Sequence, residues 1–498
     1  MQKKQTILVV ASLLVVVLSV TLAYFTAQII GKGKNVTINS ADLKIIFTDN
    51  DGSISGTNIE PGKWNVTKTF TIENKSNETY KYNIVIQDLV NTFVTNGYLQ
   101  YKITSTNGGY NMTEFKDVPK SETATDTILA YSVSISVGVT QSYTVEFKYA
   151  NDESVDQSND MGKKLSGTLF ITEGTEDPNK TLYNQLLVDK STKLTRTDFS
   201  KVLTDNNTNT LYTSTEDSKT VYYFAGNATD NWVKFGKNAS NQDLYWRIIR
   251  TNADGSIRLL YHGTSTTATN AYIGTSKFNS SYDNIGYVSY MYGSLGNIPG
   301  ARENTNNSTI KTIIDNWYKI NLEAKGYTKY LSTTAVYCND RTYTVSGSNT
   351  LFGAFTRLKT NKTPSYDCIA TEDKFTVDSS TGNGELTYPI ALMTADEVSF
   401  AGGLYGTNAP TWYYYNSANG SSTGSTVWWL LSPSVWSGSD AGVFYVYGSS
   451  SPGFLNNVNV FAGGGVRPVI SLKSCIKYST GNGSASDPYT IKETTSGC

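Results

Sequence analysis

At 498 residues, the chain is long enough for two or three domains that each bury a core of their own. Its formal net charge of −1 excludes a global electrostatic attraction to nucleic acid or to acidic lipid. An aromatic fraction of 12%, with 35 tyrosines, excludes a largely disordered chain and favours β-rich domains with weakly charged surfaces.

The N-terminal segment predicts export. Lys3 and Lys4 precede an uncharged stretch that is almost wholly apolar and long enough to cross a bilayer as a helix. Two alternatives stay open for residues 1–31: a signal peptide cleaved near Ala23 or Ala27, and an uncleaved helix that anchors the chain in the membrane. Both alternatives place the rest of the chain outside the cell, either secreted or on the cell surface.

Residues 32–174 are expected to form a β-sandwich. Short β-branched or alternating runs are separated by turn-forming clusters, which is the spacing of the strands in such folds. The expected strands are residues 43–47, 67–72, 80–86, 99–103, 132–137, 142–149 and 168–171.

This first region resembles the TasA/camelysin family of exported biofilm-matrix proteins. The resemblance rests on Ala23-Tyr24-Phe25-Thr26, Ser40-Ala41-Asp42-Leu43, Ile59-Glu60-Pro61-Gly62-Lys63 and Thr69-Phe70-Thr71-Ile72-Glu73-Asn74. It implies a jelly-roll-like sandwich that is able to assemble into fibres.

A connector, residues 175–219, is expected to follow, with a helical segment around Leu182 and Leu186. The second large domain then spans 220–474 and mixes strands with two helices. One helix is expected at 308–322, with apolar residues at helical spacing and Asn307 or Ser308 as N-cap. The other is expected at 394–401, where Thr394 and Glu397 form a capping box that also accounts for Asp396.

All four cysteines lie in the last third of the chain. Their order suggests the pairs Cys338–Cys368 and Cys475–Cys498, although four cysteines allow three pairings. No spacing is CxxC, so the cysteines offer no zinc site. The second pair would pin the polar tail, 475–498, and disulfides are typical of exported proteins.

The sequence shows no catalytic motif, and we expect a protein that is not an enzyme and needs no cofactor or metal. The only histidine, His262, lies in a strand-like segment without a GxSxG turn or other triad signal. HExxH, phosphate-loop and dinucleotide-binding motifs are also absent.

The segment from Val398 to Val466 is unusual because Asp440 is its only charged residue. Tryptophan, tyrosine and phenylalanine alternate there with serine, glycine and asparagine. Part of the segment, around Trp428-Trp429-Leu430-Leu431, is expected to be core. The remainder has the composition of binding loops, where rigid aromatic rings supply contact area and small polar residues adapt to the ligand.

The same region resembles C-type-lectin-like domains of bacterial surface proteins, including variable proteins that retroelements diversify. The residues are Trp428-Trp429-Leu430-Leu431-Ser432-Pro433, Gly464-Gly465-Val466-Arg467-Pro468-Val469-Ile470-Ser471-Leu472, Ala391-Leu392-Met393-Thr394-Ala395-Asp396-Glu397-Val398, Tyr245-Trp246-Arg247-Ile248-Ile249 and Cys338-Asn339-Asp340-Arg341. The resemblance implies an α+β domain with its ligand-binding face between Pro433 and Arg467. Arg467, the cation of this region, is expected to be buried and paired with Asp440 or with backbone carbonyls.

By this resemblance the ligand-binding residues are Ser434, Trp436, Ser437, Ser439, Asp440, Tyr445, Tyr447, Ser449, Ser450, Asn456, Asn457 and Asn459. The motifs with which calcium-dependent lectins hold the ion and the sugar are absent.

Three functional hypotheses follow from the sequence. The leading one is an adhesin-like binding protein on a bacterial surface, with a lectin-like head on a sandwich stalk and a protein or glycan ligand on another cell or a host surface. The second is a structural subunit of a matrix fibre or pilus. The third is a formylglycine-generating type of oxidase, although the closely spaced cysteine pair of those enzymes is missing.

Overall fold

A computed structural model of the chain describes residues 35–40, 43–49, 54–57, 61–178, 180–269, 271–414, 427–448 and 451–498. It divides into two compact units, Met1–Pro178 and Asn179–Cys498, which we call the N-terminal and the C-terminal unit. The fold is mainly β, with 41% of residues in strands and 14% in helices, as the sequence predicted. The expected leader, residues 1–31, lies outside the described residues. Within the described part of the chain, no helix is both long and apolar enough to cross a membrane.

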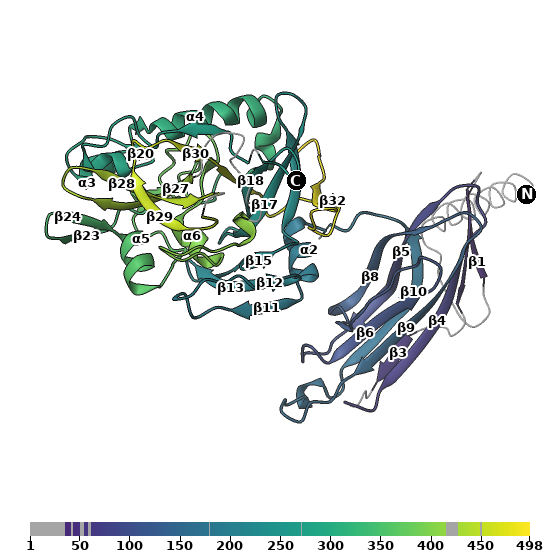
Figure 1. Cartoon of the computed structure of the whole chain (residues 1–498). Helices are drawn as coiled ribbons and strands as arrows, with labels where there is room; N and C mark the ends of the chain where they lie inside the picture. The colour runs from purple at the N-terminus through teal and green to yellow at the C-terminus, as the bar shows by residue number, and fades with distance from the viewer. Residues whose placement is uncertain are drawn as a thin grey trace, which may run out of the picture. The chain divides into compact units, whose positions relative to one another are not determined.

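The N-terminal unit is built from two antiparallel sheets (Figure 1). In spatial order the larger sheet holds β1 (Asn35–Ser40), β2 (Leu43–Asp49), β4 (Asn65–Asn74), β9 (Thr140–Tyr149), β6 (Leu99–Ser105) and β7 (Lys116–Asp117). The smaller holds β3 (Ile54–Thr57), β10 (Lys164–Glu173), β5 (Tyr80–Asn91) and β8 (Ser121–Ile135).

Both sheets contribute side chains to one hydrophobic core, because alternate residues of each strand point inward. In β9 the alternation is complete: Tyr143, Val145 and Phe147 are buried, while the intervening residues are exposed or half-buried. Asp160 fastens a loop to this core, since its carboxylate accepts hydrogen bonds from the Val94 N–H at 2.6 Å and the Tyr149 hydroxyl at 2.8 Å. Each expected strand of this region overlaps an observed one, and β8 begins well before the expected residue 132.

The C-terminal unit contains a ten-stranded sheet. In spatial order its main path is β11 (Thr192–Thr195), β13 (Thr210–Glu216), β14 (Lys219–Tyr223), β17 (Asp243–Thr251), β16 (Trp232–Lys237), β33 (Tyr489–Ile491) and β32 (Tyr478–Thr480). A branch from β17 adds β18 (Ile257–Gly263), β31 (Pro468–Leu472) and β26 (Ile390–Leu392). The expected connector and the expected tail thus both supply strands to the same sheet as the 220–474 segment.

A seven-stranded sheet carries the segment that the sequence analysis singled out. Its central strand is β27 (Val427–Trp436), which pairs with β28 (Ala441–Tyr447) along one side. The outer neighbours are β29 (Leu455–Asn459), β30 (Gly464–Val466), β19 (Gly274–Ser276), β24 (Asn349–Phe352) and β23 (Tyr343–Ser346). Three two-stranded pairs complete the unit: β12 (Asn206–Asn207) with β15 (Asn227–Ala228), β20 (Met291–Tyr292) with β21 (Asn306–Asn307), and β22 (Tyr337–Cys338) with β25 (Lys374–Phe375).

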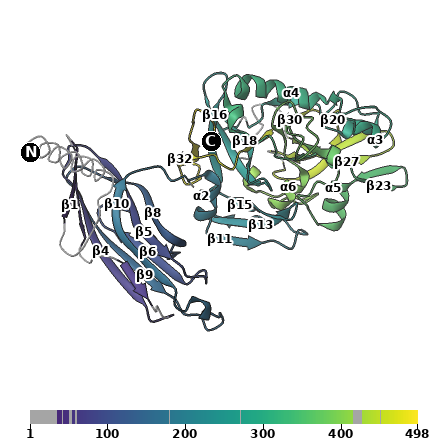
Figure 2. The ribbon, with the colours of Figure 1, turned by 180° about the vertical axis from the view of Figure 1, so that it is seen from behind.

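The helices are short. They are α2 (Leu182–Asp189), α3 (Ile298–Ala301), α4 (Thr309–Tyr318), α5 (Gly353–Phe355) and α6 (Ala395–Phe400). Ser308 caps α4, with its hydroxyl accepting from the Lys311 N–H, and Thr394 and Glu397 form the predicted capping box of α6. In both views α4 lies at one end of the unit and β11 and β13 at the other (Figures 1 and 2).

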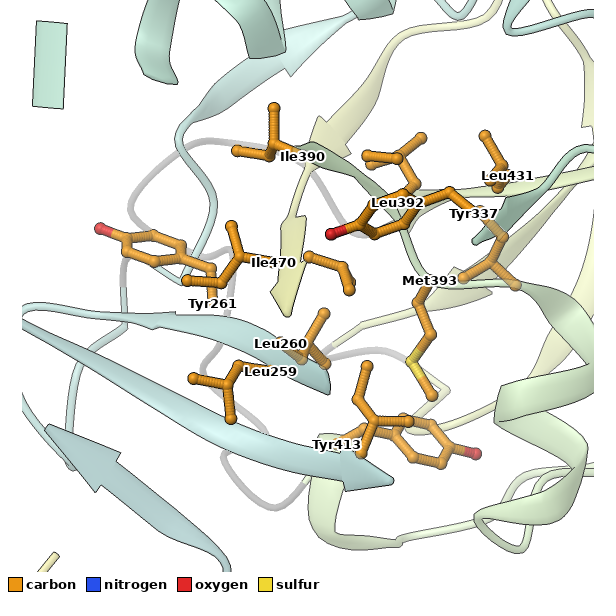
Figure 3. Close-up of a cluster of buried hydrophobic side chains, with 14 of the residues drawn as sticks. Leu259, Leu260, Tyr261, Tyr337, Ile390, Leu392, Met393, Tyr413, Leu431 and Ile470 are labelled. Carbon is orange, nitrogen blue, oxygen red and sulfur yellow. The ribbon is translucent and has the colours of Figure 1, made fainter. Parts of the chain in front are cut away.

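One large core joins the two sheets of the C-terminal unit. In Figure 3, Leu260 of β18, Leu392 of β26 and Ile470 of β31 gather with Leu431 of the other sheet. These strands are buried along their whole length, so they lack the regular alternation of apolar and polar residues that a half-buried strand shows.

Both predicted disulfides are present, Cys338–Cys368 and Cys475–Cys498. The second joins Cys498 to Cys475, which lies just before Lys477. Lys477 forms an isolated β-bridge with Thr181, and next to it the Leu182 N–H donates to the Ile476 carbonyl at 2.8 Å. The end of the C-terminal unit is therefore fastened to its beginning.

Candidate functional site

The hairpin between β27 and β28 turns at Ser437–Asp440. The Ser437 hydroxyl accepts hydrogen bonds from the Asp440 N–H at 3.0 Å and the Ser439 N–H at 3.4 Å, and these bonds close the turn. Gly438 has a φ of +90°, a left-handed conformation that glycine adopts without strain. The result is an ordered turn whose residues 437–439 are exposed.

The carboxylate of Asp440 is held in one orientation by neutral donors. The Ser439 hydroxyl donates to one oxygen at 2.6 Å, and the Asn459 amide nitrogen donates to the other at 2.8 Å. Asp440 is half-buried, and no salt bridge joins it to another described residue. Each carboxylate oxygen has two lone pairs, so the carboxylate keeps acceptor capacity for a further donor.

Two exposed aromatic rings lie beside this turn. Asn459 links the carboxylate to the first, because its amide oxygen accepts from the Phe461 N–H at 2.9 Å. The second, Tyr282, is placed by a hydrogen bond from the Ala441 N–H to its carbonyl at 2.8 Å. The two rings meet edge to face with their centroids 5.6 Å apart, and each is 41% exposed. The ammonium group of Lys277 lies 3.1 Å from the centroid of the Phe461 ring. We call this group the turn surface: Lys277, Tyr282, Ser437, Gly438, Ser439, Asp440, Asn459 and Phe461.

Four of the predicted ligand-binding residues are thus brought together, namely Ser437, Ser439, Asp440 and Asn459. The sequence analysis did not include Tyr282, Lys277 or Phe461 among the site residues. No local pattern joins Tyr282 and Lys277 to the hairpin, because they arrive from a segment far away in the chain. Phe461 was within reach of sequence reasoning, as an aromatic residue just after an expected strand.

Tyr445 and Asn457, two other predicted residues, face opposite sides of the sheet. Asn457 is two residues from Asn459 on β29 and shares its face, whereas Tyr445 pairs with Asn456 and lies on the other face. Tyr445 is only 6% exposed, and burial raises the pKa of its hydroxyl well above the ordinary value. Asn457 accepts a hydrogen bond from the Tyr405 hydroxyl at 2.7 Å.

The remaining predicted residues are distributed as follows. Ser434 is fully buried, and its hydroxyl has no hydrogen-bond partner among the described residues. Trp436, Tyr447 and Asn456 are half-buried, and the Tyr447 ring contacts Phe454 edge to face at 5.4 Å. Ser449 and Ser450 lie outside the described residues.

A buried ionic network surrounds the first turn of α6. One oxygen of Glu397 accepts from Arg258 at 2.8 Å and from Arg250 at 3.0 Å, while Arg250 also donates to Glu216 at 2.8 Å. Burial by itself raises the pKa of Glu397, but the two guanidinium groups and the Thr394 N–H outweigh burial and hold it below the usual range. The carboxyl group therefore stays ionised inside the protein.

Asp396, which the capping box alone was expected to explain, has a second role. Its carboxylate accepts a hydrogen bond from the guanidinium group of Arg357 at 2.9 Å, and Arg357 also donates to the carboxylate of Asp340 at 2.7 Å. The network encloses a cavity of only about 20 Å³, room for a water-sized molecule and not for a substrate. The network has a structural role, because its charged groups form salt bridges with one another.

Arg467 is fully buried and its positive charge faces backbone carbonyls, one of the two alternatives that the sequence left open. It donates to the carbonyls of Tyr261 at 2.8 Å and Tyr413 at 2.6 Å. A third N–H lies 3.3 Å from Nδ1 of His262. Burial, Arg467 and Arg247 lower the pKa of His262 far below its ordinary value, so the ring is neutral and out of reach of a ligand.

No group of three or more histidine, cysteine, aspartate or glutamate side chains in the described ranges is arranged to hold a metal ion. The turn surface offers an ordered carboxylate, an amide, hydroxyl groups and two aromatic rings. Comparisons with protein-family models, with curated proteins and with solved structures give no match for this chain.

Proposed function

We propose that this chain is an adhesin-like binding protein of a bacterial cell surface, secreted or membrane-anchored, that binds its ligand without catalysis at the turn surface. The observation that carries the proposal is the ordered, half-buried pair Asp440 and Asn459 beside the exposed rings of Phe461 and Tyr282. Exposed aromatic rings next to oriented polar groups are typical of recognition sites.

The position of this surface in its unit supports the proposal. In Figure 1, β28 and β29 lie on one side of the C-terminal unit, and α2 and β32 lie on the other. A ligand at the turn surface would not meet the attachment point. The proposal keeps a jelly-roll-like sandwich as stalk and a C-type-lectin-like α+β domain as head.

Extracellular localisation is part of the proposal. Two disulfides are typical of proteins that fold in an oxidising compartment, and they agree with the leader predicted at residues 1–31. The ligand would be a protein or a glycan on another cell or on a host surface.

Bacterial cells that display the full chain test the proposal. Their adhesion to epithelial monolayers and to other bacterial cells would be compared with that of cells lacking the chain. We expect adhesion, and we expect its loss when Ser439→Ala, Asp440→Asn and Asn459→Ala are combined at unchanged display level.

A matched control lies at the other side of the unit. Ser484–Asp487 forms a similar turn, in which the Ser484 hydroxyl accepts from the Asp487 N–H at 3.1 Å. Ser486→Ala combined with Asp487→Asn should leave adhesion unchanged. Adhesion that survives the triple substitution, or that never exceeds the level of cells without the chain, would overturn the proposal. Fibres formed by displayed chains without any bound surface would favour the structural alternative.

A further inference from the structure

We infer that β11 (Thr192–Thr195) and the hollow beside it form a second binding surface, which takes up an extended, acidic peptide segment of a partner protein as an additional β-strand. All residues of this surface belong to the C-terminal unit, and the inference does not depend on the turn surface.

The free edge of β11 is the first argument. Among the described strands β11 pairs with β13 alone, in parallel, and it is the outer strand of the ten-stranded sheet (Figure 1). The Thr192 N–H donates to the Asn209 carbonyl at 3.2 Å, on the side of β13. Because backbone groups alternate between the two sides of a strand, Lys193 and Thr195 direct their N–H and C=O groups away from β13. An edge of this kind is able to pair with another strand.

The lysine of this edge is engaged elsewhere. Natural sheets protect an exposed edge with charged side chains, lysine above all. The Lys193 ammonium group, however, donates to the Leu187 carbonyl at 3.0 Å, in the last turn of α2. Successive side chains of a strand point to opposite faces, so Leu194 lies on the other face, and it is 42% exposed. The edge therefore offers an apolar side chain next to free backbone groups.

A hollow of about 400 Å³ beside β11 is the second argument. Its apolar wall is formed by Leu194, by the neighbouring Tyr212 of β13, and by Val202 and Leu203 of the loop that follows β11. A strand added to β11 would place every second side chain on the face of Leu194, next to this wall. A water molecule takes about 30 Å³ in the liquid, so the hollow has room for an aliphatic side chain.

The charge of the hollow favours an acidic segment. Arg196 and Lys201 line it together with a single carboxylate, that of Asp198. This carboxylate accepts from the Ser200 hydroxyl at 2.6 Å, and its contact with Lys201, at 4.0 Å, is long for a salt bridge. The Lys201 side chain is 83% exposed and is able to reach a ligand. A carboxylate of the ligand would meet net positive charge here, whereas an ammonium group would be repelled.

Saturation-transfer NMR of the full chain with synthetic peptides tests the inference. The main probe is acetyl-Glu-Thr-Val-Thr-Glu-amide, which places the valine and both glutamates on one face of an extended chain. A second peptide has lysine in place of both glutamates, and a third has serine in place of the valine. We expect the main probe to bind about fivefold or more tightly than either of the others, because it alone combines the apolar side chain with the matching charge.

Two substitutions separate the backbone of the edge from its charge. Thr195→Pro removes an outward N–H group and should weaken binding of the main probe about tenfold or more. Lys201→Glu should weaken it about fivefold and favour the lysine peptide instead. Val345→Pro is the matched control. The Gly353 N–H donates to the Thr342 carbonyl at 2.7 Å, so the Val345 N–H also points outward, from the outer strand β23 of the other sheet. This control should leave peptide binding unchanged.

Lys201→Glu alters an exposed side chain, so it decides the test even if Thr195→Pro loosens β11. Equal binding of the acidic and the lysine peptide, no binding of any peptide, or equal weakening by Val345→Pro would each overturn the inference. Sedimentation experiments address a further occupant. If the free chain forms dimers that Thr195→Pro dissociates, the edge belongs to a second copy of this chain and the inference fails. Adhesion through the turn surface has its own test, so the proposed function stands or falls separately.

Discussion

Replacing Glu397 by glutamine tests whether the buried ionic network stabilises the C-terminal unit. The side chain is 1% exposed and serves two arginines, Arg250 and Arg258. Glutamine keeps the shape of the side chain and removes the charge. Arg250 retains Glu216 at 2.8 Å, whereas the only salt bridge that Arg258 forms with a described residue is the one to Glu397. Leaving one buried charge without its partner costs about 3–5 kcal/mol, and because Arg250 stays paired we expect about 3 kcal/mol.

Urea unfolding followed by tryptophan fluorescence measures this loss. All tryptophans except Trp64 lie in the C-terminal unit, so the signal reports on that unit. The dependence of the unfolding free energy on urea should keep its slope, which would show that the unfolded state is unchanged. Glu385→Gln, at an exposed position, is the control and should change stability by no more than about 0.5 kcal/mol. A loss below about 1 kcal/mol for Glu397→Gln would mean that the network contributes little net stability, and the reasoning would be refuted.

Three further predictions follow from the structure. The pKa of Glu397 is lowered in the folded state, so the ionised carboxylate adds to the free energy of unfolding. This stabilisation is fully present above the unfolded pKa of about 4.3 and is lost as the pH falls through the folded pKa. The stability of Glu397→Gln should therefore fall less with decreasing pH than the stability of the parent chain, as acid unfolding would show. Substituting Cys475 and Cys498 by serine should lower the stability of the C-terminal unit by about 3 kcal/mol in the same urea assay, and an unchanged midpoint would contradict this. Tyr445→Ala should cost about 3–5 kcal/mol because the ring is core, whereas Phe461→Ala should cost less than about 1 kcal/mol in thermal and urea unfolding; the reverse order would show that the two rings are wrongly assigned to core and surface.

Local signals in the sequence were sufficient for local structure. The capping box of Thr394 and Glu397 was predicted, and Ser308 is one of the two N-caps predicted for α4, because both features depend on residues within one helical turn. The strand Pro468–Leu472 and both disulfide pairs were also predicted and are present. A β-branched apolar run and the order of four cysteines carry this information without reference to distant residues.

Which residues come together in the site depends on contacts between segments far apart in the chain, and no local sequence pattern shows such contacts. Arg250 and Arg258 meet Glu397 from strands more than a hundred residues earlier in the chain. Likewise Tyr282 reaches the hairpin through one backbone hydrogen bond to Ala441. The predicted site residues also alternate between the two faces of a sheet, and β28 is buried on both faces. An uncharged, aromatic composition therefore could not show that Tyr445 is buried while the neighbouring turn is exposed.

The fastening of the C-terminal residue near Thr181 has a consequence for how this unit can be combined with others. The Thr181–Lys477 bridge and the Cys475–Cys498 disulfide hold the beginning of the unit and residues 475–498 next to each other. The turn surface, on the other side, would be unaffected by the choice of the chain that carries the unit. Adjacent ends of this kind are the feature with which domains tolerate circular permutation and insertion into other chains.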